Sequence, residues 1–381
     1  MSEPDTAARL TTPEGVRAYV RGRLEDFHPT GTPTRLPEGN LNVVWRVPGA
    51  DRSVILKYAP PHIAVDPETP LDPSRLTIEA RCLEALSPSA RLAGVGPSSV
   101  RPPRRIDLQT EPHVLIMEDC GNGPTLGRWL WEGEETTVRD KAPTIGRRLG
   151  EFIGRLHRTT LNDPDCATAF DNRPMQETRL AVQYRGVADM LRVGGVDDAV
   201  MLGERAVALG EELRSPGRCL TMGDLWPPSV LVRGDGDLRI IDWELAHYGR
   251  PLQDVAHWLA HLWMQRHRAP SEAVADAIAG HRDAFLTAYA EGLGAARDEL
   301  WDDAERRGAA IHIGAEILVR AVGPFQAGYV YAGLDADHPA VQEAVATAAA
   351  CLRAPAAADL FGPGATAGQS QGSAPARRFP R

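Results

Sequence analysis

The stretch CLTMGDLWPPSVLVRGDGDLRIIDWELAHYG, residues 219–249, decides the fold because it places two carboxylates around a short hairpin pattern. Asp224 precedes the first apolar run, and Asp242 follows the second. Magnesium prefers hard oxygen ligands, commonly one or two carboxylates together with phosphate oxygens and water. The pattern therefore indicates a magnesium-dependent phosphoryl-transfer site. A surface turn with two solvated acids is the alternative, since Asp-Gly hairpins are common.

The dipeptide Asp235-Gly236 between the apolar runs predicts a two-residue hairpin turn of type I′. In that register Ser229 lies opposite Asp242, and directly opposed residues have Cβ atoms about 4.5–5.5 Å apart. Glu244 would lie on the same face as Asp242 if the strand continued. We therefore expect Ser229 and Glu244 beside Asp242 as further metal ligands, with an ordinary turn role as the alternative for Ser229.

Composition limits the class of protein. At 381 residues the chain is long enough for two lobes, and its apolar content of 43% allows a sizeable core. The balance of 42 basic and 51 acidic side chains argues against nucleic acid or an anionic membrane as the main partner. We find neither a membrane-helix pattern nor a secretory signal. Five scattered cysteines indicate reduced thiols and a cytoplasmic location. The sequence is compatible with a homodimer.

Hydrophobic periodicity predicts an α+β fold with a small β-rich N-lobe and a larger helical C-lobe that contains the hairpin. The expected N-terminal elements are a helix at 12–27, strands at 42–47 and 53–59, a helix at 75–86 and a strand at 113–119. The expected C-terminal helices cover 142–160, 183–213, 252–267, 271–293 and 298–330. The predicted organisation is an N-terminal helix (1–33), an N-lobe (34–118), a C-lobe (119–360) and a disordered tail (361–381), the last because that segment has few apolar residues.

Several motifs occur in one order along the chain: LPEGNLNVVWRV (36–47), VILKYAPPHIA (54–64), RLTIEARCLEAL (75–86), Asp224-x4-Ser229 and Ile241-Asp242-Trp243-Glu244. This set resembles the aminoglycoside phosphotransferases, choline kinases and other protein-kinase-like small-molecule kinases. The first three motifs look most like the methylthioribose kinase branch. The resemblance runs from about residue 34 to 335 and implies a bilobal protein-kinase-like fold with ATP bound between the lobes.

The resemblance implies a nucleotide site in the N-lobe. Lys57 would reach the α and β phosphates with Glu79 as its ion-pair partner, whereas an isolated lysine at a strand end is usually an exposed charge. Three residues of the EGNLN loop would contact the phosphates, and the end of the 113–119 strand would offer backbone hydrogen bonds to adenine. The residues are Gly39, Asn40 and Asn42 for the phosphates and Met117, Glu118 and Cys120 for adenine. The implied cofactors are ATP and Mg²⁺, although the sequence leaves ATP versus GTP open.

The catalytic segment departs from the family pattern at two positions. Met222 stands where a histidine usually precedes the catalytic aspartate, and Ser229 stands where an asparagine is common. Neither change removes a group that the transfer requires, because Asp224 would still orient or deprotonate the acceptor hydroxyl and Asp242 would still hold magnesium. Asp254 in PLQDVAHW matches an aspartate that braces the catalytic loop from the next helix.

The acceptor side of the resemblance is weaker. Methylthioribose kinases carry two adjacent arginines where this chain has Val319 and Arg320. The candidate acceptor contacts are Trp226, His247, Arg250 and Arg320, each with a packing or ion-pair role as the alternative. We expect phosphoryl transfer from ATP to a hydroxyl of a small sugar-like or aminoglycoside-like molecule. The alternatives are an inactive kinase-like nucleotide-binding protein and methylthioribose kinase proper.

One motif suggests a different chemistry. His257 and His261 are one helical turn apart, a spacing that can bind zinc. The sequence offers no third ligand, and the pair is better explained as the polar face of a packed helix.

Overall fold

The computed structural model describes residues 9–37, 41–234 and 236–355. The chain divides into two compact units. Unit 1 comprises Met1–Ala93, Pro102–Asn122 and Ile241–Leu245, and unit 2 comprises Gly94–Arg101, Gly123–Ile240 and Ala246–Arg381. The predicted phosphate-loop residues Gly39 and Asn40, the turn residue Asp235 and the tail 361–381 lie outside the described residues.

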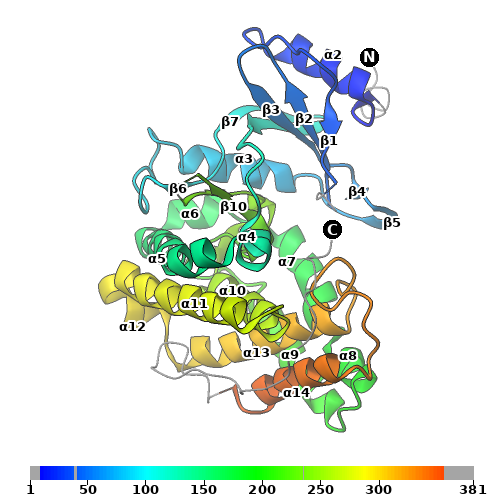
Figure 1. Cartoon of the computed structure of the whole chain (residues 1–381), viewed down its shortest axis with the longest axis vertical. Helices are drawn as coiled ribbons and strands as arrows, with labels where there is room; N and C mark the ends of the chain where they lie inside the picture. The colour runs from blue at the N-terminus through cyan, green and yellow to red at the C-terminus, as the bar shows by residue number, and fades with distance from the viewer. Residues whose placement is uncertain (1–8, 38–40, 235, 356–381) are drawn as a thin grey trace. The chain divides into compact units, whose positions relative to one another are not determined.

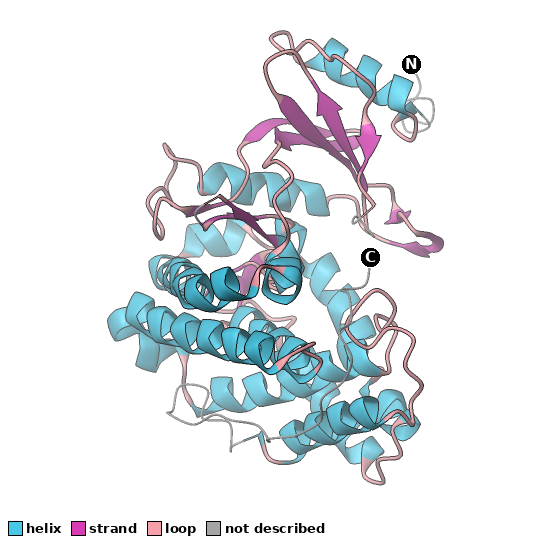
Figure 2. Cartoon of the chain, viewed as in Figure 1, coloured by secondary structure: helices cyan, strands magenta, loops and turns pink. Residues whose placement is uncertain are grey.

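Unit 1 is built on a five-stranded antiparallel sheet (Figures 1 and 2). The strand order is β1 (Thr34–Arg35), β2 (Val43–Pro48), β3 (Ser53–Tyr58), β8 (His113–Glu118) and β7 (Arg105–Thr110). A separate small hairpin pairs β4 (His62–Ile63) with β5 (Asp66–Pro70). The predicted strands at 42–47, 53–59 and 113–119 are confirmed, whereas β7 was not predicted.

Two helices accompany this sheet. α2 (Pro13–Arg23) begins at Thr12, whose side chain accepts a hydrogen bond from the backbone N–H of Gly15 and so caps the helix. Its Val16 and Val20 belong to the same apolar core as the inner side chains of β2, β3 and β8. α3 (Arg75–Ala85) is the helix predicted at 75–86, and Arg75 and Glu79 at its N-terminal end are both buried.

Unit 2 is mainly helical, and the predicted α+β class is confirmed (Figure 2). Its helices are α4 (Leu126–Glu132), α5 (Glu135–Thr159), α6 (Pro164–Ala169), α7 (Arg173–Arg179), α8 (Val187–Val193), α9 (Ala199–Glu212), α10 (Leu252–His267), α11 (Glu272–Leu293), α12 (Arg297–Leu300), α13 (Asp303–Ala321) and α14 (Pro339–Arg353). No helix within the described ranges is long and apolar enough to cross a membrane.

The helix expected over 298–330 begins where predicted but is interrupted after Leu300 and ends earlier, at Ala321. The segment contains α12 and α13, and α13 ends at Ala321, just before Gly323 and Pro324, which disfavour its continuation. Beyond it, α14 was not predicted. Its alanines lie on both the buried and the exposed face. The hydrophobic periodicity that would predict a helix is therefore weak.

Glycines bring α5 and α11 into backbone contact. Gly146, Gly150 and Gly154 are spaced four residues apart and lie on one face of α5. A Cβ at Gly150 would lie 2.2 Å from the carbonyl oxygen of Phe285 on α11. Only a residue without a Cβ allows this approach, so we call these three residues the glycine ridge.

The hairpin of the opening stretch differs from its predicted register. β10 (Val230–Arg233) and β11 (Asp237–Ile240) pair Arg233 with Asp237 and Val230 with Ile240, so the turn covers three residues, 234–236. The predicted two-residue turn, and with it the placement of Ser229 opposite Asp242, is wrong.

The hairpin is also not the only β structure in the helical unit. β6 (Val100–Arg101) adds a parallel strand to β11, and β9 (Cys219–Thr221) pairs with β12 (His247–Gly249).

Candidate active site

Unit 1 contains a buried cluster of charges around Lys57. The Nζ atom of Lys57, on β3, lies 2.8 Å from Oε2 of Glu79 on α3 and 2.8 Å from Oδ1 of Asp242. The predicted Lys57–Glu79 ion pair is therefore present. The Lys57 and Glu79 side chains are almost fully buried, whereas 43% of the Asp242 side chain is exposed. Asp242 is the carboxylate of this cluster that a ligand can reach.

A second layer of contacts surrounds Glu244. Its carboxylate accepts hydrogen bonds from Nδ2 of Asn42 at 2.8 Å and from Nε of Arg75 at 2.9 Å. Arg75 also donates to Oδ1 of Asn42 at 3.0 Å. The sequence reasoning missed Arg75, although its position one helical turn before Glu79 was a usable signal.

The argument that placed Glu244 on one strand face with Asp242 is wrong. Trp243–Leu245 forms a 3₁₀ turn, and Asp242 has a left-handed φ of 64°. Glu244 is 4% exposed and lies 3.5 Å from Lys57 Nζ. These contacts make Glu244 an anchor that joins Arg75, Asn42 and Lys57.

Carboxyl groups outnumber basic groups in this cluster, and burial raises the pKa of one of them, Glu79, to about 7. Lys57 and Arg75 face three carboxylates, those of Glu79, Asp242 and Glu244. Burial opposes the charge on Lys57, but the three carboxylates outweigh this and hold its pKa well above the usual range. An ionised lysine with one excess carboxylate and one exposed aspartate oxygen donor fits a site for Mg²⁺ and phosphate oxygens.

The predicted adenine-contact segment lies at the end of β8. The side chains of Met117 and Cys120 are buried, and the Glu118 carboxylate accepts a hydrogen bond from the backbone N–H of Arg104 at 3.1 Å. An adenine contact by this segment stays a prediction.

In unit 2, Asp254 holds the loop that carries Asp224. The two Asp254 carboxylate oxygens accept backbone hydrogen bonds from Met222 at 2.9 Å and from Gly223 at 2.8 Å. Nε2 of His157 lies 3.0 Å from the same carboxylate. Gly223 has a positive φ of 79°, which turns the chain immediately before Asp224. The predicted bracing role of Asp254 is confirmed, and Met222 is fully buried in the place of the usual histidine.

Two side chains contact one oxygen of Asp224. Arg179 Nη2 lies 3.1 Å and His257 Nε2 3.3 Å from Oδ1. Burial raises the pKa of Asp224, but the contact with His257 and the charges of Arg179 and Arg320 outweigh it and lower the pKa to about 2. Asp224 is therefore ionised throughout the physiological range. No motif in the sequence pointed to Arg179 or His257 as partners of Asp224.

Ser229 is engaged within its own turn. Its Oγ donates to the carbonyl oxygen of Trp226 at 2.8 Å and accepts from the backbone N–H of Trp226 at 3.3 Å. Its side chain is fully buried in the 3₁₀ turn Pro227–Ser229. These contacts support the turn role that was the alternative to metal binding.

Arg320 lies among aromatic rings. Its guanidinium carbon is 4.6 Å from the ring centre of Trp226, 5.3 Å from that of Phe325 and 5.5 Å from that of Tyr329. Its Nε donates to Oε1 of Glu316 at 2.8 Å. Cation–π contacts and this ion pair fix the guanidinium group. The structure thus brings together two predicted acceptor contacts, Trp226 and Arg320.

The other two predicted acceptor contacts have structural partners. His247 is 2% exposed and lies in β12, paired with Thr221 of β9. Arg250 donates to Glu305 at 2.7 Å and to Glu212 at 3.2 Å. These environments match the packing and ion-pair alternatives, so we leave both residues out of the proposed site.

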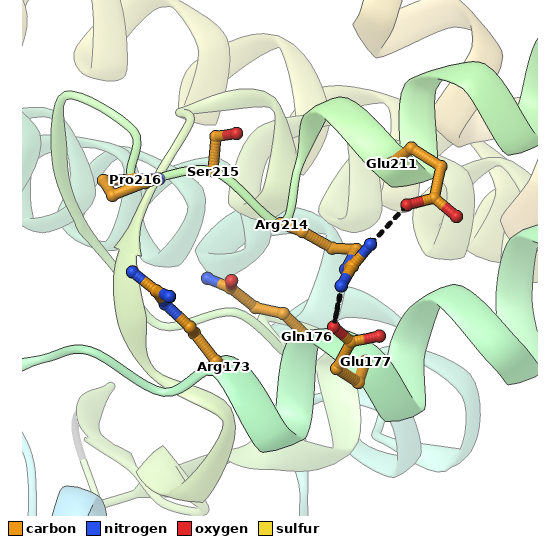
Figure 3. Close-up of a pocket in the computed structure, with 7 residues that line it drawn as sticks. All are labelled: Arg173, Gln176, Glu177, Glu211, Arg214, Ser215 and Pro216. Atoms are coloured by element: carbon orange, nitrogen blue, oxygen red, sulfur yellow. Dashed lines mark hydrogen bonds and ion pairs between the residues drawn. The ribbon is translucent and has the colours of Figure 1, made fainter.

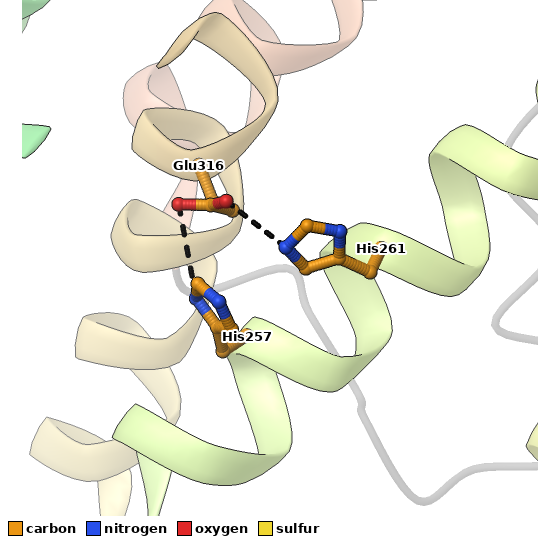
Figure 4. A group of neighbouring side chains, drawn as sticks. All are labelled: His257, His261 and Glu316. Atoms are coloured by element: carbon orange, nitrogen blue, oxygen red, sulfur yellow. Dashed lines mark ion pairs between the residues drawn. The ribbon is translucent and has the colours of Figure 1, made fainter. Parts of the chain in front are cut away.

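A third group joins the two histidines that suggested zinc. His257 and His261 of α10 face Glu316 of α13, and the three potential ligand atoms lie within 4.8 Å of one another (Figure 4). His261 Nε2 is 3.0 Å from Glu316 Oε1, the oxygen that also accepts from Arg320. A metal ion bound there would face the Arg320 cation at close range. The geometry therefore favours a protein-only polar network, although Glu316 is a third group that the sequence did not indicate.

A surface cavity of about 280 Å³ lies elsewhere in unit 2 (Figure 3). It is lined by Arg173, Gln176, Glu177, Glu211, Arg214, Ser215 and Pro216. Arg214 donates to Glu177 and to Glu211, both at 2.6 Å, so its charge is already neutralised. None of the predicted site residues lines this cavity.

These two constellations, a lysine–carboxylate cluster and a braced aspartate loop, agree with a family match. The chain belongs to the phosphotransferase enzyme family, whose model matches residues 32–307. It is therefore a kinase, as expected from the motifs.

Two relatives and one solved structure illustrate the relationship. The chain is 28% identical to a 4-hydroxytryptamine kinase of Psilocybe cyanescens, over 74% of this chain and 81% of the relative. It is 26% identical to a methylthioribose kinase of Exiguobacterium sibiricum, over 61% of each chain. The macrolide 2′-phosphotransferase MphH from Brachybacterium faecium is 20% identical, with a TM-score of 0.46, over 88% of this chain and 97% of that one.

Proposed function

We propose that this protein transfers the γ-phosphate of ATP to a hydroxyl group of a small molecule, with Asp224 as the catalytic residue. The observation that carries the proposal is the Asp224 carboxylate itself, ionised, partly exposed and held on a loop that Asp254 braces. Phosphoryl transfer depends mainly on positioning and charge stabilisation. A carboxylate with a low pKa suits this task, because it can orient a hydroxyl and accept its proton late in the transfer.

In this proposal the unit 1 cluster binds the nucleotide. Lys57 contacts the phosphates, and Asp242 holds magnesium, which would neutralise charge on the phosphate oxygens when bound. Glu79 and Glu244 keep Lys57 charged and fixed, as the 2.8 Å and 3.5 Å contacts indicate. Gly39 and Asn40, which lie outside the described residues, remain predicted phosphate contacts, and Glu118 and Cys120 remain predicted adenine contacts.

For the acceptor, we propose a molecule with a flat face next to its hydroxyl group. Trp226 and Phe325 place aromatic rings beside Arg320, whose charge contributes to the low pKa of Asp224, and Phe325 is 40% exposed. Rings of this kind stack on aromatic or sugar rings. The relatives' names favour two acceptors for a first screen, 4-hydroxytryptamine and methylthioribose. Aminoglycosides complete the panel.

A nucleotide-binding protein without activity is the second candidate. It would be expected to lack Lys57, Asp224 or Asp242, and all three are present. We further propose a cytoplasmic location, in keeping with five cysteines that form no disulfide bond.

The test compares the wild type with Asp224→Asn. ADP release is measured with the acceptor panel, and ATP affinity is measured by calorimetry in magnesium buffer. We expect the variant to lose about 10²–10⁴-fold in turnover, the range for removal of a general base, while ATP affinity stays within about twofold of the wild type. Equal turnover in the two proteins would overturn the role of Asp224. ATP binding without ADP release from the wild type would favour the inactive binding protein.

A further inference from the structure

A buried chain of polar side chains leads from Asp224 into the core of unit 2. His257 on α10 contacts Asp224 with Nε2, and its Nδ1 lies 3.2 Å from Nε2 of His312 on α13. Nδ1 of His312 lies 2.6 Å from the hydroxyl of Tyr184. The three partners beyond Asp224 are almost completely buried. Packing alone does not require such a chain. Apolar side chains could fill the same space without the desolvation cost that each buried polar group must offset with a hydrogen-bond partner.

The partners assign the hydrogens along this chain. An ionised carboxylate only accepts, so His257 must carry its hydrogen on Nε2. Burial and the nearby charge of Arg179 hold the pKa of His312 well below its usual range, so His312 is neutral. With Tyr184 donating to Nδ1, the hydrogen of His312 is on Nε2 and points to His257 Nδ1. All donors then point toward Asp224.

We propose that His257, oriented by His312 and Tyr184, is the positioning residue of the catalytic carboxylate. It holds Oδ1 of Asp224 together with Arg179 and leaves Oδ2 for the acceptor hydroxyl. The inference rests on the proposed role of Asp224. It also explains why Met222 is tolerated: α10 supplies a histidine at the catalytic aspartate in a chain whose motif lacks one.

The geometry of Asp224 supports this division between its oxygens. Both ion pairs reach Oδ1, at 3.1 Å from Arg179 and 3.3 Å from His257, whereas no hydrogen bond or ion pair among the described residues reaches Oδ2. Nε2 of His257 lies within ion-pair distance of Oδ1 of Asp224, but the two atoms are not aligned as in a well-formed hydrogen bond. Catalytic contacts often tighten when the substrate binds.

The charged and titratable groups around Asp224 come from three helices. Arg179 belongs to α7, His257 to α10 and Arg320 to α13, and all three favour its ionised form. Glu316 of α13 is the carboxylate on the other side of the ring, 3.7 Å from Nδ1 of His257. Removal of His257 therefore takes away one of three influences that lower the pKa of Asp224.

The test uses three variants of the full chain. His257→Leu removes the donor, His257→Gln retains an N–H group near the position of Nε2, and His281→Gln replaces a buried histidine of α11 as the control. Turnover is measured as magnesium-dependent ATP hydrolysis, with water as the acceptor, and with 4-hydroxytryptamine. We expect His257→Leu to lose about 10–100-fold in kcat, the effect of one hydrogen bond to a charged group. His257→Gln should recover most of the loss, and His281→Gln should keep the wild-type kcat.

A pH profile separates positioning from a structural role. In His257→Leu the pKa of Asp224 rises, so the acidic limb of the kcat/KM profile should move to higher pH than in the wild type. Only the ionised carboxylate can accept the hydroxyl proton, which fixes the direction. An unchanged acidic limb would contradict the proposal, even if kcat fell.

Tyr184→Phe tests the chain without a cavity at Asp224, in case His257→Leu does not fold. Loss of the Tyr184 donor should change the ¹⁵N chemical shifts of His312 and His257 and lower kcat about 2–10-fold, as for one neutral hydrogen bond. Wild-type kcat in both His257→Leu and Tyr184→Phe, together with an inactive Asp224→Asn, would overturn the inference but not the proposed function. Wild-type activity of Asp224→Asn would overturn the proposed function itself.

Discussion

At the scale of single residues, Asp242 combines a chemical role with an unusual backbone. Its φ of 64° lies in the left-handed region, where aspartate, asparagine and glycine are better tolerated than other residues. The sequence indicated the carboxylate through the Ile-Asp-Trp-Glu motif, but no pattern in the sequence reports a dihedral angle.

Two substitutions separate the effect of the Asp242 carboxylate from the effect of its left-handed backbone conformation. Asp242→Gly and Asp242→Ala should abolish magnesium-dependent ATP binding equally, because both remove the carboxylate. Alanine should be less stable than glycine by about 1 kcal/mol, since only alanine is strained at this φ. Calorimetry with and without Mg²⁺ and urea unfolding measure the two effects. Retained magnesium dependence in either variant would contradict the metal assignment.

Arg75 offers a second residue-level test. It is 1% exposed and pairs with the buried Glu244. Arg75→Met removes one of the two cations that face this carboxylate and leaves Lys57 and Asn42, so we expect the free energy of unfolding to fall by up to about 3–5 kcal/mol, the range for breaking a buried ion pair. Arg128→Met, which breaks an exposed pair with Glu132, should change it by less than about 1 kcal/mol. Similar losses of unfolding free energy in the two variants would show that the buried Arg75–Glu244 pair stabilises the fold no more than the exposed Arg128–Glu132 pair.

At the scale of elements, periodicity located the strands and most helices but not their edges. The hairpin illustrates the reason. The dipeptide Asp235-Gly236 favours a two-residue turn, yet Gly234 has a φ of 42° and extends the turn to three residues. One extra residue moves every cross-strand pair, because side chains alternate faces along a strand. Local sequence permits both turns, and the contacts that choose between them, such as Arg148 donating to the carbonyl oxygen of Gly236 at 2.8 Å, are distant in sequence.

The glycine ridge gives the element-scale prediction. Gly150→Leu would drive a side chain into the carbonyl of Phe285 and force α5 and α11 apart. We expect a loss of about 1–3 kcal/mol in the free energy of unfolding, or more if the helices cannot separate. Gly22→Ala in α2 is the control: a Cβ there meets nothing within 4 Å. That change should stabilise by about 0.4–1 kcal/mol, and urea unfolding compares the two.

At the scale of the whole molecule, buried histidines make stability depend on pH. Burial lowers the pKa of His281 to about 4, from an ordinary value of 6.5, against the hydrogen bond with the carbonyl of Ala142. The unfolded chain therefore binds a proton between pH 6.5 and 4 that the folded chain does not. His281 contributes stability that is present above pH 6.5 and is lost as the pH falls toward 4.

We expect this loss to be about 3 kcal/mol for His281 alone, at 1.36 kcal/mol for each unit of pKa shift. Urea unfolding of the wild type and of His281→Gln at pH 7.5, 6, 5 and 4 measures it. The difference in unfolding free energy between the two proteins should shrink as the pH falls. A constant difference across this range would contradict a neutral buried His281.

The packing of helices around Asp224 is the part of the site that could not be predicted from the sequence. Asp224, Asp242 and Lys57 were found because their motifs are contiguous and share a family resemblance. The partners of Asp224 come from α7, α10 and α13, so they become visible only when these helices pack. Periodicity indicates that a helix has a buried face, but it does not say which residue of another helix that face meets.

The glycine ridge also bears on how freely this protein can change. Gly146, Gly150 and Gly154 take no part in the proposed chemistry, yet a Cβ at any of them would collide with the backbone of α11. New acceptor specificity can be sought at Trp226 and Phe325 beside Arg320, because Phe325 is 40% exposed and Trp226 is only partly buried. At the ridge an acceptable change needs a matching shift of an entire helix. A library designed to evolve the enzyme should diversify the aromatic residues beside Arg320 and keep the glycine ridge fixed.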